Sequence, residues 1–378
     1  MFADDTQCSG VFMAIGMNRT EKSLFSLLRM ALHNRVETNI DWKRVTEEEW
    51  KQCYRLAALH GVMAVAWDGI QYIEQGRVLP RSLKLSWGLA VQNYEDQYDR
   101  FCQVVSELSD IFSQQGIEMV QIKGVGLSTY YPVPSHREGG DIDIYTYSAN
   151  RNLYTDKEAN HKADEVMRSL GIEVDNTHPK HSNFMYRGIS VENHRVFLNV
   201  HLYDVAKSMN QLLMELLKPQ SVSLCEGKYK VNVPPPIFNC MYLPFHAAQH
   251  YGEGIKIHHL FDIACLIKQE GWQLSSKVTD PRLLNFIHSL VSLCRQLFNL
   301  DIQVEDNKLY TEEIYRHMMH PQYSNKVPVK GKITVLGYKI RRTLHSYRKL
   351  KTIFRFTFFR WIGNSIIYHL RKPRSIFQ

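Results

Sequence analysis

The sequence of 378 residues lacks the long apolar run that a membrane-spanning helix requires, which is about 18 residues without charges. It also has no low-complexity tract and no internal repeat, so fibrous and repeat architectures are excluded. Hydrophobic residues make up 44% of the chain and charged residues 22%, as in ordinary globular proteins. The length leaves room for two or three domains with their own cores.

Cysteine is scarce and is not arranged in pairs. The seven cysteines are an odd number, and none are spaced as C-x-x-C. This pattern disfavours a zinc ribbon or a disulfide framework and predicts free thiols in a reducing compartment, with the cytoplasm as the expected location. Asp4 and Asp5 make the N-terminus acidic, and its apolar stretch is short, so it does not predict a secretory signal. Met17 is a candidate start.

Several catalytic motifs are also missing. The chain has no G-x-S-x-G, no Walker loop and no H-E-x-x-H. Serine-hydrolase, P-loop and zinc-protease chemistry therefore have no support in the sequence.

Acidic residues are absent from the C-terminal segment 326–378, which carries 14 Lys and Arg. The preceding residues carry 32 basic and 38 acidic groups, so all of the excess positive charge lies in this segment. Its basic residues alternate with aromatic and aliphatic ones. Three readings stay open: a helix on an anionic membrane surface, a platform for a nucleic acid, which is less favoured, or helices that pack on the body. Gly363 and Asn364 interrupt the apolar pattern and favour two short segments over one long helix.

Periodicity divides the chain into four regions and predicts an α+β fold. Apolar residues at helical spacing predict an N-terminal helical region over 1–95, in which Thr46 with Glu49 forms a capping-box pattern. Short alternating segments and glycine turns predict a small mixed α/β core over 96–232. Helical spacing returns over 233–325, and the basic segment 326–378 follows.

One predicted strand contains two acids where apolar residues are expected. In "EGGDIDIYTY", Asp141 and Asp143 point to one face of the strand, and Ile142 and Ile144 point to the other. We expect both carboxylates on the exposed face, close enough to repel unless a cation neutralises them. Mg²⁺, which prefers carboxylate and phosphate oxygens, is the natural partner. The alternative is that the acids only cap a turn or end an edge strand.

The sequence around this strand favours the metal interpretation. Upstream, Lys123, Gly124 and Gly126 form a K-G-x-G turn before a short predicted helix, where backbone N–H groups can bind a phosphate. Downstream, Glu192 lies on a strand from which it could reach the two aspartates. Three converging carboxylates suit phosphoryl transfer assisted by two metal ions.

These segments resemble the DNA polymerase β-like nucleotidyltransferase superfamily, and most closely its bacterial family of uncharacterised nucleotidyltransferases. The resemblance rests on "IKGVGLSTYYP", "REGGDIDIY" and "VENHRVF", with "LAALHGV" and "HHLFDIACLI" in the helical flanks. It extends over about residues 20 to 300. The sequence departs from the superfamily at the turn, where Lys-Gly stands in place of Gly-Ser.

The resemblance implies a role for each matching residue. Asp141 and Asp143 would bind Mg²⁺ or Mn²⁺, and Glu192 would be a third ligand or a base. The triphosphate of a nucleoside triphosphate such as ATP would lie on the turn. Its expected contacts are Lys123, Gly124, Gly126, Ser128 (in place of the missing hydroxyl) and Arg137, which would lie near the phosphates or pair with the acids.

Other polar residues have simpler interpretations. His246 and His250 stand four apart on a predicted helix, but without an H-E-x-x-H motif we favour a helix face beside the core that lines the nucleotide site over a zinc site. Asp262 is expected to be structural. His178 and His181 are expected in a loop, where they would be solvated or meet an acceptor.

The sequence therefore predicts a metal-dependent transfer of a nucleoside monophosphate from a nucleoside triphosphate to an unidentified acceptor hydroxyl, with release of pyrophosphate. Two alternatives remain. One is a D-x-D glycosyltransferase that uses a nucleotide-sugar. The other is a non-catalytic, membrane-associated adaptor with a decayed nucleotidyltransferase fold.

Overall fold

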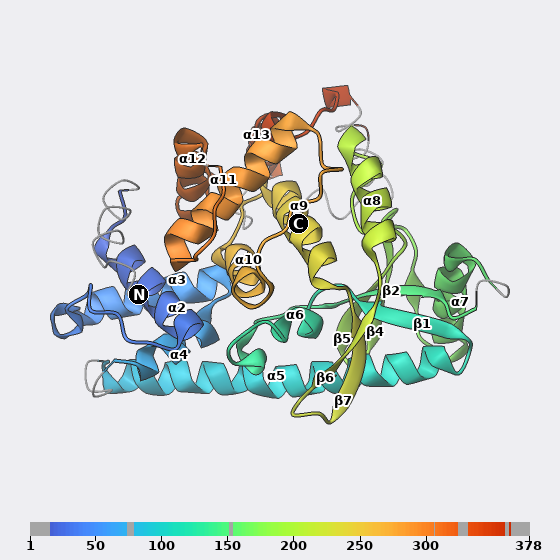
Figure 1. Cartoon of the computed structure of the whole chain (residues 1–378), viewed down its shortest axis with the longest axis horizontal. Coiled ribbons are helices and arrows are strands. Elements are labelled where there is room, and N and C mark those ends of the chain that lie inside the picture. The colour runs from blue at the N-terminus through green and yellow to red at the C-terminus, as the bar shows by residue number, and fades with distance from the viewer. Residues whose placement is uncertain are drawn as a thin grey trace.

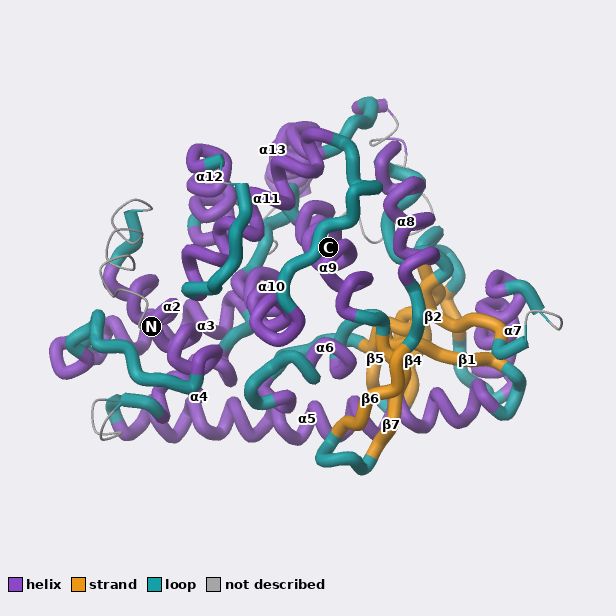
Figure 2. Tube along the Cα trace, viewed as in Figure 1, coloured by secondary structure: helices purple, strands orange, loops and turns teal. Residues whose placement is uncertain are grey.

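A computed structural model describes residues 16–73, 79–150, 154–305, 307–323, 332–359 and 363 (Figures 1 and 2). It combines many helices with a small mixed sheet, which confirms the predicted α+β class. The N-terminal residues to which the signal-peptide prediction applies lie outside the described part of the chain. Among the described residues, no helix combines the length and the apolar composition needed to cross a bilayer. The six described cysteines are all free thiols.

The N-terminal region is helical, as predicted. It contains α2 (Arg19–His33), α3 (Glu47–His60) and α4 (Met63–Gln71). The predicted capping box is present at the start of α3, because the Glu49 carboxylate accepts a bond from the Thr46 backbone N–H (2.7 Å) while Thr46 Oγ1 accepts one from the Glu49 N–H (3.3 Å). This region packs against the C-terminal helices in one apolar core.

A single helix of 33 residues, α5 (Arg81–Ser113), joins the helical region to the sheet. It runs along one side of the molecule, from the N-terminal helices to the strands (Figure 1). The sequence predicted helices up to residue 95 and a separate core from residue 96, and the single helix α5 passes through that predicted boundary. The four predicted regions remain a prediction, since α5 belongs to the packing of both neighbours.

The main sheet has five strands in the order β1-β2-β5-β4-β3. These strands are β1 (Ile117–Gln121), β2 (Ile142–Ser148), β3 (Val174–Asp175), β4 (His181–Tyr186) and β5 (Ile189–His194). The β2–β5 pair is parallel and the other pairs are antiparallel, so the sheet is mixed, as predicted.

The two faces of the sheet meet different surroundings. Ile142 and Ile144 of β2 are fully buried with Val191 of β5 in a core that includes residues of α5 and α7 (Asp156–Ser169). The opposite face carries Asp143, Glu192 and His194. The predicted alternation, with the two isoleucines on one face of the strand and the acids on the other, is therefore present.

Helices return after the sheet, as predicted. They are α8 (Asp204–Leu216), α9 (Pro236–His250), α10 (Ile257–Glu270), α11 (Pro281–Phe298), α12 (Lys308–Met319) and α13 (Lys332–Ile353). A hairpin of β6 (Gln220–Leu224) and β7 (Tyr229–Val233) precedes α9. The basic segment thus begins with a 22-residue helix that ends ten residues before Gly363. The second of the two predicted segments falls on residues outside the described part.

Candidate active site

Parallel pairing of β2 and β5 places Asp143 directly beside Glu192 in the strand register. Residues in register on neighbouring strands point to the same face, so the two carboxylates share one surface. Asp141 immediately precedes β2 and is two residues from Asp143. The structure therefore brings together the three acids that the sequence singled out.

The predicted exposure of the two aspartates was wrong for Asp143. Its side chain is only 2% exposed, whereas the Glu192 side chain is 24% exposed. Residues from α9 and α10 line the same cleft as Asp141 and Asp143, so this face of the sheet is covered. A sequence pattern shows which face a strand residue occupies, but only packing decides whether that face meets water.

Two basic side chains bind the buried carboxylate of Asp143. Lys123 Nζ lies 2.9 Å from Asp143 Oδ1, and His194 Nε2 lies 2.9 Å from the same oxygen. Burial alone would raise the pKa of Asp143, but the Lys123 charge and the His194 hydrogen bond hold that pKa well below its usual range. Lys123, which the sequence assigned to the triphosphate, therefore also neutralises an acid.

The pKa of Asp141 is shifted in the opposite direction from that of Asp143, and the pKa of Glu192 in the same direction. Burial, followed by the charge of Asp143, raises the pKa of Asp141. Burial would also raise the pKa of Glu192, but a hydrogen bond from His194 Nε2, 3.3 Å from Glu192 Oε2, lowers it overall. His194 thus bridges Asp143 and Glu192, and it holds two acids together that would otherwise repel.

The predicted glycine turn lies at the mouth of this site. Gly124 has φ +65° and precedes the short helix α6 (Val125–Ser128), and a Cβ there would come within 2.7 Å of Gln121 Nε2. Glycine is required because a side chain would be strained at this φ and would clash. The turn lets the backbone of residue 124 reach the cleft, which Lys123 and Gly124 both line.

Two other residues of the turn have packing roles. A Cβ at Gly126 would lie 2.9 Å from Val233 Cγ1, so this glycine allows α6 to approach β7. Ser128 is fully buried, and its hydroxyl donates to the Val125 carbonyl (2.6 Å). The expected phosphate contacts of Gly126 and Ser128 remain predictions. Neither residue is among the described residues that line the cleft.

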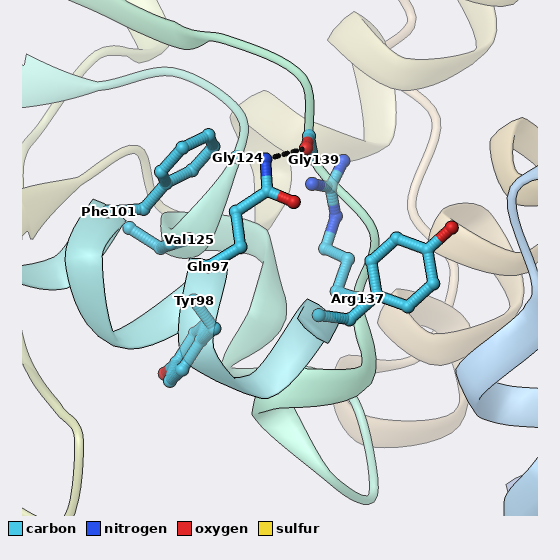
Figure 3. A pocket seen from close by; sticks show the side chains of 8 residues that line it. Gln97, Tyr98, Phe101, Gly124, Val125, Arg137 and Gly139 are labelled. Atoms are coloured by element: carbon cyan, nitrogen blue, oxygen red, sulfur yellow. Dashed lines mark hydrogen bonds between the residues drawn. The ribbon is translucent and has the colours of Figure 1, made fainter. Parts of the chain in front are cut away.

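The loop before β2 is fixed against α5 (Figure 3). Gln97 Nε2 donates to the backbone carbonyl of Gly139 (3.1 Å), and Gly124, Arg137 and Gly139 line a small cavity beside this contact. The glycine turn and the R-E-G-G loop thus line one recess. This contact positions Asp141 at the end of the loop.

Arg137 pairs with an acid, although not with the expected ones. Its Nε and Nη2 donate to the two oxygens of Asp262 on α10 (2.8 and 2.9 Å), and Tyr131 Oη donates to Asp262 Oδ1 (2.7 Å). Arg137 and Asp262 are both almost fully buried. Asp262 is therefore structural, as predicted, and it joins α10 to the loop that carries Asp141.

The cleft has two walls of different chemistry. We call the sheet wall the cleft-lining residues Lys123, Asp141 and Asp143, together with His194 and Glu192, which are bonded behind them. We call the helical wall the set that faces it from α9 and α10, which is Leu243, His246, His258, His259 and Asp262. The prediction that His246 lies on a helix face lining this site agrees with the lining of the cleft.

Two basic groups near the acids were missed or assigned to a loop. Lys180 directly precedes β4, and burial together with the nearby Lys123 charge lowers its pKa to about 8. His181 starts β4, pairs in register with His194, and has Nε2 3.5 Å from Glu192 Oε2. Burial lowers its pKa to about 4. Only strand pairing reveals these positions, because they lie in a loop-like stretch of sequence.

The donor set of the sheet wall fits a divalent cation. One ligand atom each from Asp143, Glu192 and His194 lies within 4.8 Å of the others, and Asp141 adjoins them. Carboxylate oxygens that are already close and anionic are the ligands Mg²⁺ prefers. The Lys123 ammonium shows that the site favours positive charge next to Asp143.

A family model described as "Uncharacterised nucleotidyltransferase" matches residues 46–299. No curated protein and no solved structure gives a match. The matched range contains both walls of the cleft, the glycine turn and α10, and it confirms the resemblance inferred from the sequence. Because the match extends over more than half of the chain, the protein belongs to the uncharacterised nucleotidyltransferase family.

Proposed function

We propose that the protein transfers a nucleoside monophosphate from a nucleoside triphosphate to an acceptor hydroxyl. In this reaction the acceptor oxygen bonds to the α-phosphorus, the bond from the α-phosphorus to the bridging oxygen breaks, and pyrophosphate leaves. The hydroxyl proton passes to a carboxylate. Membership of the family supports the reaction class, and the acceptor remains to be identified.

One observation carries the proposal: Asp143 and Glu192 lie in register on adjacent parallel strands, with Lys123 bonded to Asp143 and the Gly124 turn in the same cleft. A metal-binding acid pair beside a phosphate-binding turn is what phosphoryl transfer requires. A cap or an edge strand would need neither the pairing nor the burial of Asp143.

Each residue has a distinct part in the proposed reaction. Asp141, Asp143 and Glu192 would hold Mg²⁺ or Mn²⁺. The ion would neutralise the charge of the triphosphate and the negative charge that develops in the transition state. Lys123 can exchange its carboxylate partner for a phosphate, because its ammonium already lies at the edge of the cleft. Glu192, the more exposed acid of the in-register pair, would be the third metal ligand or the base that receives the acceptor proton.

The sheet order supports this reading over a nucleotide-sugar glycosyltransferase. A doubly wound nucleotide-binding sheet is mostly parallel, with helices on both faces. Here β2–β5 is the parallel pair of the main sheet, while β1–β2, β4–β5 and β3–β4 are antiparallel.

The test is a transfer assay with four α-labelled nucleoside triphosphates, Mg²⁺ or Mn²⁺, and a fractionated lysate as the source of acceptor. We expect label in one fraction, and a loss of at least about 100-fold with Asp141→Asn or Asp143→Asn. Asp141→Asn is the safer variant for folding, since Asp143 neutralises a buried lysine. Glu165→Gln, an exposed acid on α7, is the matched control.

Three outcomes would reject the proposal. If either aspartate variant transferred label as well as the wild type, the proposed metal site would have no part in the reaction. Label from a nucleotide-sugar instead of a triphosphate would favour the glycosyltransferase. Absence of binding by calorimetry at millimolar nucleotide with Mg²⁺ would favour the adaptor.

We further propose that α13 associates with an anionic membrane surface. One face of α13 packs on the body, where Ser346 Oγ donates to the Gly252 carbonyl (2.7 Å) and Leu350 is buried. The outward face carries Leu336, Ile340 and Leu344, which are 45%, 51% and 39% exposed. Exposed basic residues, Arg341, Arg348 and Lys351, accompany this apolar stripe. An apolar stripe beside Arg and Lys suits anionic lipid.

A further inference from the structure

Three histidines from two helices converge beside the cleft that contains the acids, and two of them, His246 and His259, line it. His246 and His250 lie one turn apart on α9, and His259 lies in the first turn of α10. Their ring centroids are 4.6 Å (His246–His250), 5.9 Å (His246–His259) and 5.5 Å (His250–His259) apart. One ring nitrogen from each lies within 4.8 Å of the others.

A neutral imidazole carries a proton on one ring nitrogen and offers the lone pair of the other nitrogen to a ligand. Burial, followed by the charge of Lys123, lowers the pKa of His250 to about 4 and the pKa of His246 well below its ordinary value. Burial, followed by the charge of His258, also lowers the pKa of His259 well below its ordinary value.

Contacts within the described part of the chain leave the cluster open to a ligand. His246 has no hydrogen bond to any described residue, and its ring stacks on Tyr242 at 5.6 Å. The nearest acid to His250 is Glu253, whose Oε2 is 4.0 Å from His250 Nδ1. A carboxylate on that side favours the tautomer that leaves Nε2 free for a metal.

We propose that His246, His250 and His259 form a binding site for a transition-metal ion of the Zn²⁺ type, separate from the acidic site on the sheet wall. Two histidines four residues apart on one helix face are a common pair of zinc ligands, and a third from another helix completes a three-nitrogen set. Mg²⁺ prefers oxygen ligands, so this set discriminates against the ion expected at the aspartates.

Binding requires one local exchange at His259. Its Nδ1 accepts a hydrogen bond from the Lys256 backbone N–H (3.1 Å), so in the neutral ring the proton is on Nε2. His259 would give up this bond and offer Nδ1, or rotate to offer the other nitrogen after the proton moves. The loss of one hydrogen bond is small beside the binding of a structural or catalytic zinc ion.

Three protein ligands leave the fourth tetrahedral position open, as in catalytic zinc sites. His246 and His259 line the cleft that also contains Asp141 and Asp143, so the open position is accessible from the cleft. If the proposed nucleotidyl transfer holds, this position would receive an oxygen of the triphosphate or of the acceptor. The metal site itself does not depend on that reaction.

The test measures Co²⁺ binding by the purified full chain in excess Mg²⁺, by equilibrium dialysis and by the visible absorption of tetrahedral Co²⁺. We expect one Co²⁺ per chain, displaced by Zn²⁺. His246→Gln and His250→Gln should each weaken binding by at least about 100-fold. His161→Gln is the matched control, because His161 is an exposed histidine on α7 and is outside the three-nitrogen group, and the affinity of this variant should equal that of the wild type.

Asp143→Asn separates this inference from the proposed function, because it should abolish transfer and leave Co²⁺ binding unchanged. Thermal melting without metal confirms that each variant is folded. The inference is rejected if the chain binds no Co²⁺, if folded His246→Gln and His250→Gln both bind as tightly as the wild type, or if Asp143→Asn removes the ion.

Discussion

The sheet wall and the helical wall of the cleft present opposite chemistry to the same space. The sheet wall is ionic: Lys123 and Asp143 form a buried pair, and His194 joins Asp143 to Glu192. The helical wall is dominated by neutral, partly buried histidines. An oxygen-rich wall suits a hard cation and a nitrogen-rich wall suits a softer one, so the two walls can hold different ligands in one cleft.

The walls also differ in how the sequence encodes them. Asp141 and Asp143 are two residues apart on one segment, and the period of a strand places them together. His246 and His259 are on different helices, and only the packing of α9 against α10 makes them neighbours. A local pattern is visible in a sequence, whereas a convergence of helices is not.

The pair formed by Arg137 and Asp262 connects the two walls, and breaking it should have the largest effect on stability. Asp262→Asn leaves the buried Arg137 guanidinium without a countercharge and weakens the bond from Tyr131. We expect the free energy of unfolding to fall by about 3–5 kcal/mol, measured by urea denaturation. This loss would separate the loop that carries Asp141 from α10.

A double variant tests the cause. Arg137→Met combined with Asp262→Asn removes the unpaired charge, so it should be more stable than Asp262→Asn alone. If the double variant is less stable than the single one, the destabilisation does not come from an orphaned charge.

The two walls should lose stability in different ranges of acid pH. His60, buried in α3, accepts a hydrogen bond from the Ile257 N–H at the start of α10 (3.3 Å), and burial lowers its pKa to about 4. The unfolded chain protonates this residue near pH 6.5, so its stabilising contribution is complete above that value and is lost as the pH falls towards 4. The pKa of Asp143 is lowered below about 3.9, so its contribution is lost only in stronger acid.

His60→Asn isolates the pH range in which His60 titrates. The asparagine oxygen can replace Nδ1 as the hydrogen-bond acceptor, but it does not titrate. Between pH 7 and about pH 4.5, the wild type should lose up to about 3 kcal/mol more unfolding free energy than this variant. Urea denaturation at several pH values measures the difference. If the unfolding free energies of the two proteins depended on pH in the same way, His60 would not be the source of the stability lost in this pH range.

The exposed apolar stripe of α13 offers the smallest expected effect. Changing Leu336, Ile340 and Leu344 together to Gln should weaken binding to phosphatidylserine vesicles by at least about tenfold, because the apolar stripe of α13 is lost. Leu309→Gln on α12 removes a leucine that is 80% exposed and is the control. Cosedimentation measures both. Equal binding of the wild type to neutral and anionic vesicles would contradict the surface assignment.

The predictions from sequence succeeded where one local period decides the outcome. The capping box at Thr46, the two faces of β2 and the glycine turn at Gly124 each depend on a few adjacent residues. Predictions that depended on distant segments were less complete. The length of α5, the partner of Arg137 and the burial of Asp143 are set by elements far apart in the chain, and no spacing within one segment encodes them.

The sequence by itself determined that Asp141 and Asp143 share a strand face, that a glycine bend precedes them, and that a third acid lies on a later strand, because backbone geometry fixes which side chains of one segment align. Tertiary structure alone decided that Glu192 pairs with Asp143 and that Lys123 and His194 bind that acid. It also decided that three histidines of α9 and α10 converge. The physical reason is that strand pairing and helix packing follow from the burial of apolar surface over the whole chain, which no single segment specifies.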